Sequence, residues 1–196
     1  MLSWIGNPQI TPRRFLFLDR DGVINWDRRD YVKSWSEFEF CPDSLAALRH
    51  LYQHHVGVIV VSNQSALNRG YIDWARFWHM HRQVIHHIRE AGGDILAAFY
   101  CPHRPDEGCS CRKPLPGMLW AAAKLFRITL QSAAMIGDRA TDVLTARNAG
   151  CRAVLLDRVR PDGSTSDLAG PDSCVPDDSF PSLLDAALAL YGDTPA

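Results

Sequence analysis

Short, almost purely apolar runs alternate with longer amphipathic segments along this chain, and this alternation limits its fold more than any other feature. Each run holds four to six residues, a length that suits a strand better than a helix. Runs without a polar face are typical of strands that are buried on both faces of a parallel sheet. The expected strands are residues 15–18, 56–61, 95–100, 133–136 and 153–156.

The segments between these runs predict helices that connect parallel strands. In residues 43–54, the side chains of Leu45, Leu48 and Leu51 fall on one side of a helix, which can pack against a sheet. Asp73 is a favourable N-cap for the next helix. The alternation predicts an α/β fold: a Rossmann-like open parallel sheet with helices on both faces and right-handed crossovers. The expected helices are residues 43–54, 73–91, 117–126, 140–149 and 181–191.

The length of 196 residues and the hydrophobic content of 46% are those of one globular domain with a substantial core. We therefore predict a single domain over residues 1–196. Because only 22% of the residues are charged, the composition excludes a mostly disordered chain. Residues 160–179 are rich in Asp, Pro, Gly and Ser and predict a long surface loop.

The charges nearly cancel, since 21 Lys and Arg residues face 22 Asp and Glu residues for a net charge of -1. No overall field would draw such a chain to nucleic acid or to an anionic membrane. No apolar run approaches the ~20 residues of a membrane span, and residues 1–14 lack the apolar core of a signal peptide. We expect a cytoplasmic monomer without nucleic-acid or membrane partners, whose six cysteines are thiols or metal ligands rather than disulfides.

Polar side chains follow three of the apolar runs, at the points where the strands should end. Asp19 and Asp21 follow the first run, Ser62 and Asn63 follow the second, and Asp138 follows the fourth. In open α/β sheets, ligands bind outside the carboxyl ends of the strands. We therefore expect these side chains to converge on one site, although they are far apart in sequence.

The first of these motifs, Asp19-Arg20-Asp21-Gly22, has the residues for a two-step transfer reaction. One carboxylate can be a covalent nucleophile, and a second can act as general acid and then as general base. Together with Asp138, these groups would repel each other unless a cation lay between them, and hard oxygen ligands favour Mg²⁺. The alternative interpretation is that these aspartates only cap a helix and form an Asp-Gly turn.

Four further residues could handle phosphate at the same edge. The Ser62 hydroxyl can bond a phosphoryl oxygen, and Lys113 can neutralise both the phosphate and the nucleophile. Arg112 can hold a second anionic group bidentately. Asp142, one helical turn after Asp138, could orient Lys113 or a metal-bound water. The alternative interpretations are that Ser62 only ends a strand, that Arg112 and Lys113 are solvated surface charges, and that Asp142 caps a helix.

Three cysteines and a histidine lie close together in residues 101–111 and form a complete tetrahedral zinc set of the Cys₃His type. A closed set leaves no coordination position for a substrate, so this zinc should be structural. It should hold in place the loop that carries Arg112 and Lys113. The alternative is a set of buried free thiols beside a surface histidine. The predicted ligands are Cys101, His103, Cys109 and Cys111. The remaining cysteines, expected in the core or on the surface, are Cys41, Cys151 and Cys174.

In their order and positions at the strand ends, these motifs resemble the haloacid dehalogenase superfamily of phosphohydrolases over most of the chain. The resemblance implies that Asp19 is the nucleophile and that Asp21 protonates the leaving group and then activates water. It also implies that Ser62 and Lys113 stabilise the transferring phosphoryl group. Asp19, Asp138 and the backbone carbonyl of Asp21 would hold Mg²⁺.

The cysteine loop with the following Arg-Lys-Pro-Leu-Pro-Gly-Met, and the Asn-Gln-Ser at residues 63–65, narrow the resemblance to the heptose bisphosphate phosphatases. This implies removal of the 7-phosphate of D-glycero-D-manno-heptose 1,7-bisphosphate, a small sugar bisphosphate, in the biosynthesis of nucleotide-activated heptose for lipopolysaccharide. It also implies that no large cap domain covers the site. The implied substrate-binding residues are Asn63, Gln64, Ser65, Arg69, Arg112 and Lys113. Two residues expected to support the site from behind are Arg139 and Asp142.

Two other functions stay open. Histidinol-phosphate phosphatases share the zinc loop and the catalytic set, but Arg69 and Arg112 suit a second phosphate better than the cationic group of histidinol phosphate. A non-catalytic binding module held together by zinc would need the aspartates only as caps. Departures from the family pattern in residues 27–31 and 66–68 affect substrate-contact regions and leave the catalytic set intact.

Overall fold

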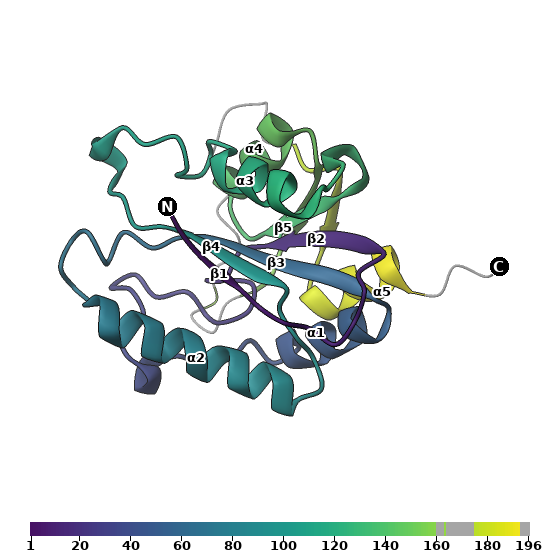
Figure 1. Cartoon of the computed structure of the whole chain (residues 1–196), viewed down its shortest axis with the longest axis horizontal. Helices are drawn as coiled ribbons and strands as arrows, with labels where there is room; N and C mark the ends of the chain where they lie inside the picture. The colour runs from purple at the N-terminus through teal and green to yellow at the C-terminus, as the bar shows by residue number, and fades with distance from the viewer. Residues whose placement is uncertain (160–162, 164–174, 193–196) are drawn as a thin grey trace.

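The five apolar runs are the central strands of a seven-stranded sheet in the computed structural model, which describes residues 1–159, 163 and 175–192 (Figure 1). The strand order is β1-β4-β3-β2-β5-β6-β7. The strands from β2 to β7 that lie side by side run parallel, so the predicted sheet type is confirmed. The strands are β1 (Leu2–Ile5), β2 (Arg14–Leu18), β3 (Val56–Asn63), β4 (Ala97–Cys101), β5 (Ala134–Gly137), β6 (Arg152–Leu156) and β7 (Asp178–Phe180).

All five predicted helices are present, and their ends lie within two residues of the predicted ones. The Asp73 side chain accepts a hydrogen bond of 2.8 Å from the Arg76 amide and so caps the second helix, as predicted. Short 3₁₀ turns occupy residues 35–37, 105–107 and 130–132. The helices are α1 (Ser44–Gln53), α2 (Trp74–Glu90), α3 (Gly117–Phe126), α4 (Ala140–Ala149) and α5 (Leu183–Tyr191).

The two faces of the sheet bury alternate side chains of the same strands. In β2, Leu16 and Leu18 pack into the apolar layer that α1, α2 and α5 cover, whereas Phe17 packs into the layer that α3 and α4 cover. Figure 1 shows α3 and α4 on one side of the sheet and α1 and α2 on the other. Burial on both faces explains why the strand segments carry no polar face.

The two outer strands of the sheet were not predicted. β1 pairs antiparallel with β4, and only Leu2 and Trp4 turn inward while Ser3 and Ile5 are exposed. Such a short alternation at an edge gives little periodic signal. The predicted loop 160–179 is wrong at its end, because β7 begins at Asp178 and pairs parallel with β6. Most of that loop lies outside the described residues.

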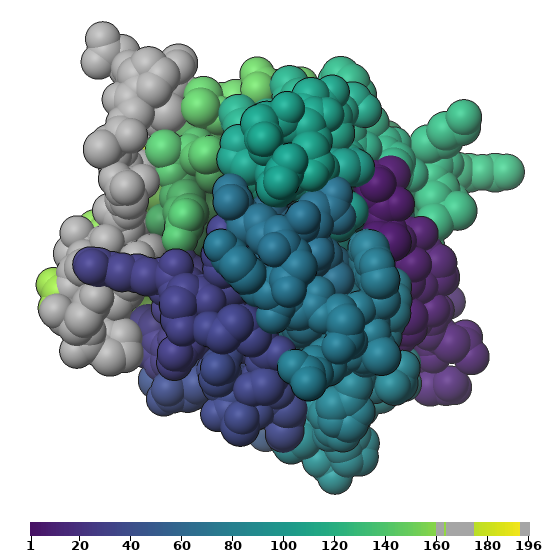
Figure 2. All heavy atoms as spheres, turned by 90° about the vertical axis from the view of Figure 1, so that its left-hand side faces the viewer, coloured from purple at the N-terminus to yellow at the C-terminus, as the bar shows by residue number. Residues whose placement is uncertain are grey.

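No helix in the described ranges is both long and apolar enough to cross a membrane. The loops that follow β2, β3 and β4 gather at the left-hand side of Figure 1, and Figure 2 looks onto that side. This edge is the carboxyl end of the parallel strands, where ligands bind in open α/β sheets.

Candidate active site

The carboxyl ends of β2, β3 and β5 meet around a cavity of about 290 Å³. β2 lies between β3 and β5, so the residues that end these three strands become neighbours. Asp19 directly follows β2, and its amide donates a 3.0 Å hydrogen bond to the Ile136 carbonyl of β5. Ser62 is the penultimate residue of β3, and Asp138 directly follows β5. The sheet therefore brings together the polar residues that follow these strands.

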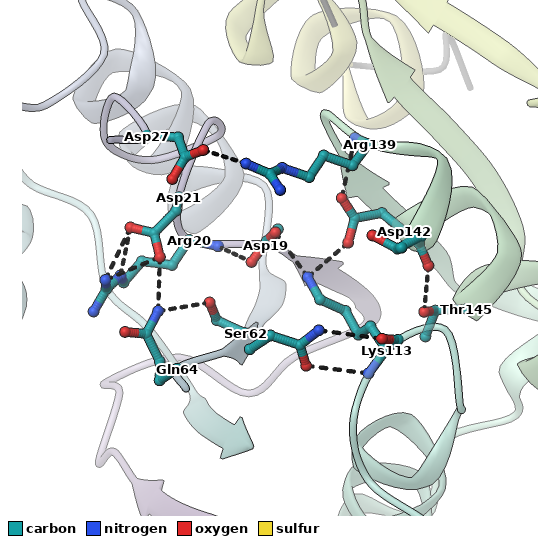
Figure 3. A network of polar contacts seen from close by, with 12 residues as sticks. Asp19, Arg20, Asp21, Asp27, Ser62, Gln64, Lys113, Arg139, Asp142 and Thr145 are labelled. Atoms are coloured by element: carbon teal, nitrogen blue, oxygen red, sulfur yellow. Dashed lines mark hydrogen bonds and ion pairs between the residues drawn. The ribbon is translucent and has the colours of Figure 1, made fainter. Parts of the chain in front are cut away.

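The Asp19 carboxylate is held at both oxygens (Figure 3). Its Oδ1 accepts a 2.7 Å hydrogen bond from the Arg20 amide, and its Oδ2 lies 2.7 Å from the Lys113 ammonium. Burial raises the pKa of Asp19 to about 7; Lys113 opposes this shift, and nearby carboxylates, including Asp142, add to it. The aspartate is thus oriented, and a cation beside it would favour its charged form.

Lys113 lies between two carboxylates. Its Nζ is 2.7 Å from Asp19 and 2.6 Å from Asp142, and the whole residue is 4% exposed. Burial alone would lower the pKa of Lys113, but the charges of Asp142 and Asp19 outweigh it and raise this pKa. Asn63 pairs with the Lys113 backbone in both directions, at 3.1 and 3.2 Å. Lys113 is therefore a fixed cation next to the Asp19 carboxylate.

Asp21 accepts hydrogen bonds from three side chains. Arg20 contacts both carboxylate oxygens, at 2.8 and 3.0 Å from its Nη2, while Asn25 and Gln64 donate at 2.9 and 2.7 Å. Burial would raise the pKa of Asp21, but the Arg20 charge and these hydrogen bonds outweigh it and lower this pKa. The Gln64 amide also donates to Ser62 Oγ at 3.0 Å. The Ser62 hydroxyl thus accepts from Gln64 and keeps its own proton for another acceptor.

Three buried carboxylates lie close enough together to hold a metal ion. One oxygen from each of Asp19, Asp138 and Asp142 lies within 4.8 Å of the others. Asp142 lies in the first turn of α4, where it pairs with Lys113 and accepts a 3.2 Å hydrogen bond from the Arg139 amide, whereas Asp19 and Asp138 directly follow the adjacent strands β2 and β5. Asp19 and Asp138 are therefore the side chains that best fit a hard cation such as Mg²⁺.

Glycine is required at two positions beside these carboxylates. Gly22 has a φ of +84°, and a Cβ atom there would overlap the Asp138 carboxylate. A Cβ atom at Gly137 would overlap Asp142. The Asp-Gly and Gly-Asp pairs of the two motifs are thus explained by the close approach of the backbone to the carboxylates.

The predicted zinc ligands converge on one point. The Sγ–Sγ distances from Cys109 are 3.6 Å to Cys101 and 3.7 Å to Cys111, and His103 Nδ1 lies 3.4 Å from both Cys101 and Cys111. Zn–S bonds of ~2.3 Å and Zn–N bonds of ~2.0 Å in a tetrahedron give edges of roughly 3.5 to 3.8 Å. The four ligand atoms therefore have the spacing of a closed zinc site. Cys41 and Cys151 are buried elsewhere, and Cys174 lies outside the described residues.

The loop with this cluster reaches the cavity through its two basic residues. Arg112 and Lys113 both line the cavity, and Arg112 Nη1 donates a 3.0 Å hydrogen bond to the His103 carbonyl. Asn63, Gln64 and Ser65 also line it, whereas Arg69 is exposed and is not among the lining residues. The role predicted for Arg69 thus has no counterpart in the shape of the cavity and stays a prediction.

Several residues of the site were not singled out in the sequence. Asn25 is fully buried against Asp21, and Asp27 forms an ion pair with Arg139 across the cavity mouth. A polar residue directly after the apolar pair Val23 and Ile24 is a sequence signal that could have found Asn25. Residues 27–31 were expected only as a substrate-contact region, without a role for their individual side chains. The basic residues that line the cavity are Arg20, Arg28, Arg29, Arg112, Lys113 and Arg139, and the acidic ones are Asp19, Asp21 and Asp27.

Comparison with known proteins agrees with this geometry. Residues 110–186 match the family described as HAD-hydrolase-like. A protein of Pseudomonas aeruginosa named D-glycero-beta-D-manno-heptose-1,7-bisphosphate 7-phosphatase is 42% identical over 144 residues, which are 74% of this chain and 81% of that protein. The chain belongs to the heptose bisphosphate phosphatase family of HAD-like hydrolases. A Helicobacter pylori protein of the same name is 37% identical over 75% of this chain and 84% of its own length.

Solved structures of this family have the same fold. The crystal structure of the D,D-heptose 1,7-bisphosphate phosphatase of B. bronchiseptica, complexed with magnesium and phosphate, superposes with a TM-score of 0.80 at 34% identity. The superposition covers 90% of this chain and 97% of the B. bronchiseptica chain. A putative HAD-like phosphatase of Mesorhizobium loti has a TM-score of 0.75 at 29% identity and covers 98% of this chain and 95% of its own. The expected family and fold class are confirmed.

Proposed function

We propose that this chain is a Mg²⁺-dependent phosphomonoesterase that removes the 7-phosphate of D-glycero-D-manno-heptose 1,7-bisphosphate through an aspartyl-phosphate. The observation that carries the proposal is the arrangement of Asp19, Lys113 and Asp21 at the strand ends, in a chain 42% identical to a protein named for this activity. A binding module would not need a buried lysine 2.7 Å from the first aspartate of the motif.

In the proposed first step, Asp19 attacks phosphorus while Asp21 gives the leaving sugar oxygen the proton that it took from water in the preceding turnover. The bond from Asp19 to phosphorus forms as the phosphorus–oxygen bond to the sugar breaks. Ser62 donates its hydroxyl proton to a phosphoryl oxygen, because its oxygen already accepts from Gln64 at 3.0 Å. Lys113 balances the charge that develops on the phosphoryl oxygens.

In the second step, Asp21 takes a proton from water, whose oxygen attacks the phosphorus of the aspartyl-phosphate. The Asp19 carboxylate is regenerated and inorganic phosphate leaves. The buried anions would be stabilised by Mg²⁺, which supplies positive charge for the phosphoryl oxygens when it is held by Asp19, Asp138 and the Asp21 carbonyl.

We assign a structural zinc to the cysteine loop, with Cys101, His103, Cys109 and Cys111 as its ligands. The ligand spacing of 3.4 to 3.7 Å supports this assignment. The loop carries Arg112 and Lys113 directly after the last ligand, so a closed metal site would hold both residues in place at the cavity.

A substrate with two phosphates fits the charges of the cavity. Six basic and three acidic side chains line it. Four of the basic residues form ion pairs with aspartates: Arg20 with Asp21, Arg28 with Asp30, Lys113 with Asp19, and Arg139 with Asp27. Among the described residues, Arg29 and Arg112 form no ion pair and are free to bind a second anionic group.

The test measures Mg²⁺-dependent phosphate release from both anomers of the heptose bisphosphate, with histidinol phosphate beside them and Asp19→Asn as the blank. We expect strong preference for the heptose bisphosphate. Preference for histidinol phosphate would keep the mechanism and overturn the substrate. Absence of release from every substrate by folded, zinc-loaded protein would overturn the proposed activity.

A further inference from the structure

Arg20 carries a guanidinium group that is buried beneath the cavity, between the sheet and α2. The residue is 5% exposed, and apolar side chains of the sheet and α2 surround it together with His81 and Tyr100. Among the described residues, Asp21 is the only carboxylate that forms an ion pair with this group. A buried cation is costly unless it is paired, so the fold commits the Arg20 side chain to Asp21.

The contact is a fork rather than a single bond (Figure 3). Nε and Nη2 of Arg20 donate to Asp21 Oδ1 at 3.1 and 2.8 Å, and Nη2 also donates to Oδ2 at 3.0 Å. A planar guanidinium that contacts both oxygens determines the plane of the carboxylate, which the point charge of a lysine does not. Asn25 donates a further hydrogen bond to Oδ1 of Asp21, and Gln64 donates one to Oδ2.

The backbone and the side chain of Arg20 support different carboxylates. The amide N–H donates to Asp19 Oδ1 at 2.7 Å, a bond that does not depend on the side chain at this position. The other oxygen of Asp19 is held by Lys113. A change of the Arg20 side chain therefore removes support from Asp21 and leaves both contacts of the nucleophile in place.

Among the described residues that line this part of the core, no basic side chain other than His81 could replace the guanidinium. His81 is the nearest candidate, but burial, followed by the charges of Arg20 and Arg82, lowers its pKa to about 4. It is therefore neutral at pH 7, and its Nδ1 lies 2.9 Å from the Tyr100 hydroxyl.

We infer that Arg20 is a positioning residue, whose guanidinium fork holds the Asp21 carboxylate in the orientation from which it takes the proton of the attacking water. The inference rests on the proposed function. A leaving group that is stable as an anion needs no proton from Asp21 in the first step. The second step always needs Asp21, because water must lose a proton as its oxygen bonds to phosphorus.

The test follows Arg20→Met with p-nitrophenyl phosphate in a rapid-mixing experiment. We expect one nitrophenolate per enzyme at close to the wild-type first-turnover rate, followed by turnover about 100-fold slower than wild type. With the heptose bisphosphate, whose leaving oxygen needs a proton, we expect loss of kcat without a matching rise in KM. Arg20→Lys should lose about 10-fold, because it keeps the charge without the fork.

Two controls frame this result. Asp21→Asn should give the same burst without turnover, and Tyr100→Phe, which borders the Arg20 side chain without touching Asp21, should behave as wild type. If Arg20→Met does not fold, the burst and turnover of Arg20→Lys test the same inference. Loss of the burst together with turnover, or wild-type kinetics in Arg20→Lys, would overturn the inference. Inactive wild-type enzyme would instead overturn the proposed function.

Discussion

The carboxylate cluster and the cysteine cluster lie at the same edge of the molecule but are assembled in different ways. Asp19 lies far in sequence from Asp138 and Asp142, and the pairing of β2 with β5 brings the three together. The four zinc-type ligands come from the short segment 101–111 that follows β4. The first cluster depends on the whole sheet, whereas the second needs little more than its own loop.

This difference in assembly corresponds to a difference in chemistry. The carboxylates are crowded, and burial raises the pKa of Asp19 to about 7, so a cation held among them would stabilise their charged forms. The cysteine cluster is closed, with ligand spacings that suit one zinc ion. Changes in the first cluster should therefore affect turnover, and changes in the second should affect stability.

The most severe break of the carboxylate cluster is Asp19→Asn. An amide cannot form the aspartyl-phosphate, so we expect phosphate release to fall by about 10⁴-fold or more. The variant removes one of several crowded anions, so its unfolding temperature should stay close to that of wild type. Asp106→Asn, which changes an exposed aspartate of the cysteine loop, is the matched control and should keep its activity. Activity of Asp19→Asn at even 1% of wild type would contradict the proposed nucleophile.

Metal removal separates the two clusters in the wild-type chain. A brief exposure to EDTA should reduce turnover by about 10³-fold, because Mg²⁺ supplies several kcal/mol of transition-state stabilisation. Added Mg²⁺ should restore it. The zinc content, measured by native mass spectrometry, should not change during this treatment. Turnover that survives full removal of Mg²⁺, or a simultaneous loss of zinc, would contradict the proposed division between the two sites.

Cys109→Ser breaks the cysteine cluster and leaves the carboxylates unchanged. The variant should lose zinc and at least about 3 kcal/mol of unfolding free energy, because metal binding contributes directly to folding. For a chain of this size that loss is a fall in Tm of roughly 10 °C. Cys151→Ser, which changes a buried thiol outside the cluster, is the control and should keep its zinc. A Cys109→Ser variant with full zinc content and unchanged Tm would remove the structural-zinc assignment.

Acid provides a further test of the comparison, because it acts through a residue of neither cluster. Burial, followed by the charges of Arg20 and Arg82, lowers the pKa of His81 to about 4, below its usual 6.5. The unfolded chain then binds more protons than the folded one between these two values, so stability falls as the pH is lowered from 6.5 toward 4. The shift corresponds to about 3 kcal/mol.

His81→Leu should flatten this part of the stability profile, measured by urea unfolding at several pH values. Trp4 and Trp78 pack edge-on against the imidazole, and Tyr100 bonds its Nδ1, so leucine keeps an apolar contact but loses one hydrogen bond. An unchanged acid limb in the variant would show that other groups, the crowded aspartates first among them, control the acid response.

The periodic parts of the fold were predictable, and the edges were not. Five strands and five helices follow from continuous apolar runs and from amphipathic spacing, which are local properties of the chain. β1 and β7 were missed because they are only four and three residues long. At the outer edges of the sheet, a strand forms because it packs on one face or pairs with its neighbour, and not because it has a long apolar run. The domain organisation, the oligomeric state and the cellular location stay predictions.

The site was predictable as a set of residues but not as a set of contacts. The motif residues at the ends of β2, β3 and β5 could be placed at one edge, because parallel strands end together. Nothing local indicated that Arg20 turns back onto Asp21, that Gln64 bridges Asp21 and Ser62, or that Asp27 pairs with Arg139. These contacts depend on which side chains the packing forces together.

The sequence by itself determined the order of the five central strands and the five helices, the chemical types at the strand ends and the grouping of cysteines and histidine in residues 101–111. It could do so because apolar periodicity and close ligand spacing act over a few residues. Only the tertiary structure decided which charges neutralise each other. Lys113 is shared by Asp19 and Asp142, whereas the Arg20 guanidinium forms an ion pair with Asp21 only, among the residues that the structure describes. That choice depends on burial and on distances across the sheet, since the cost of an unpaired charge is set by its surroundings and not by its neighbours in sequence.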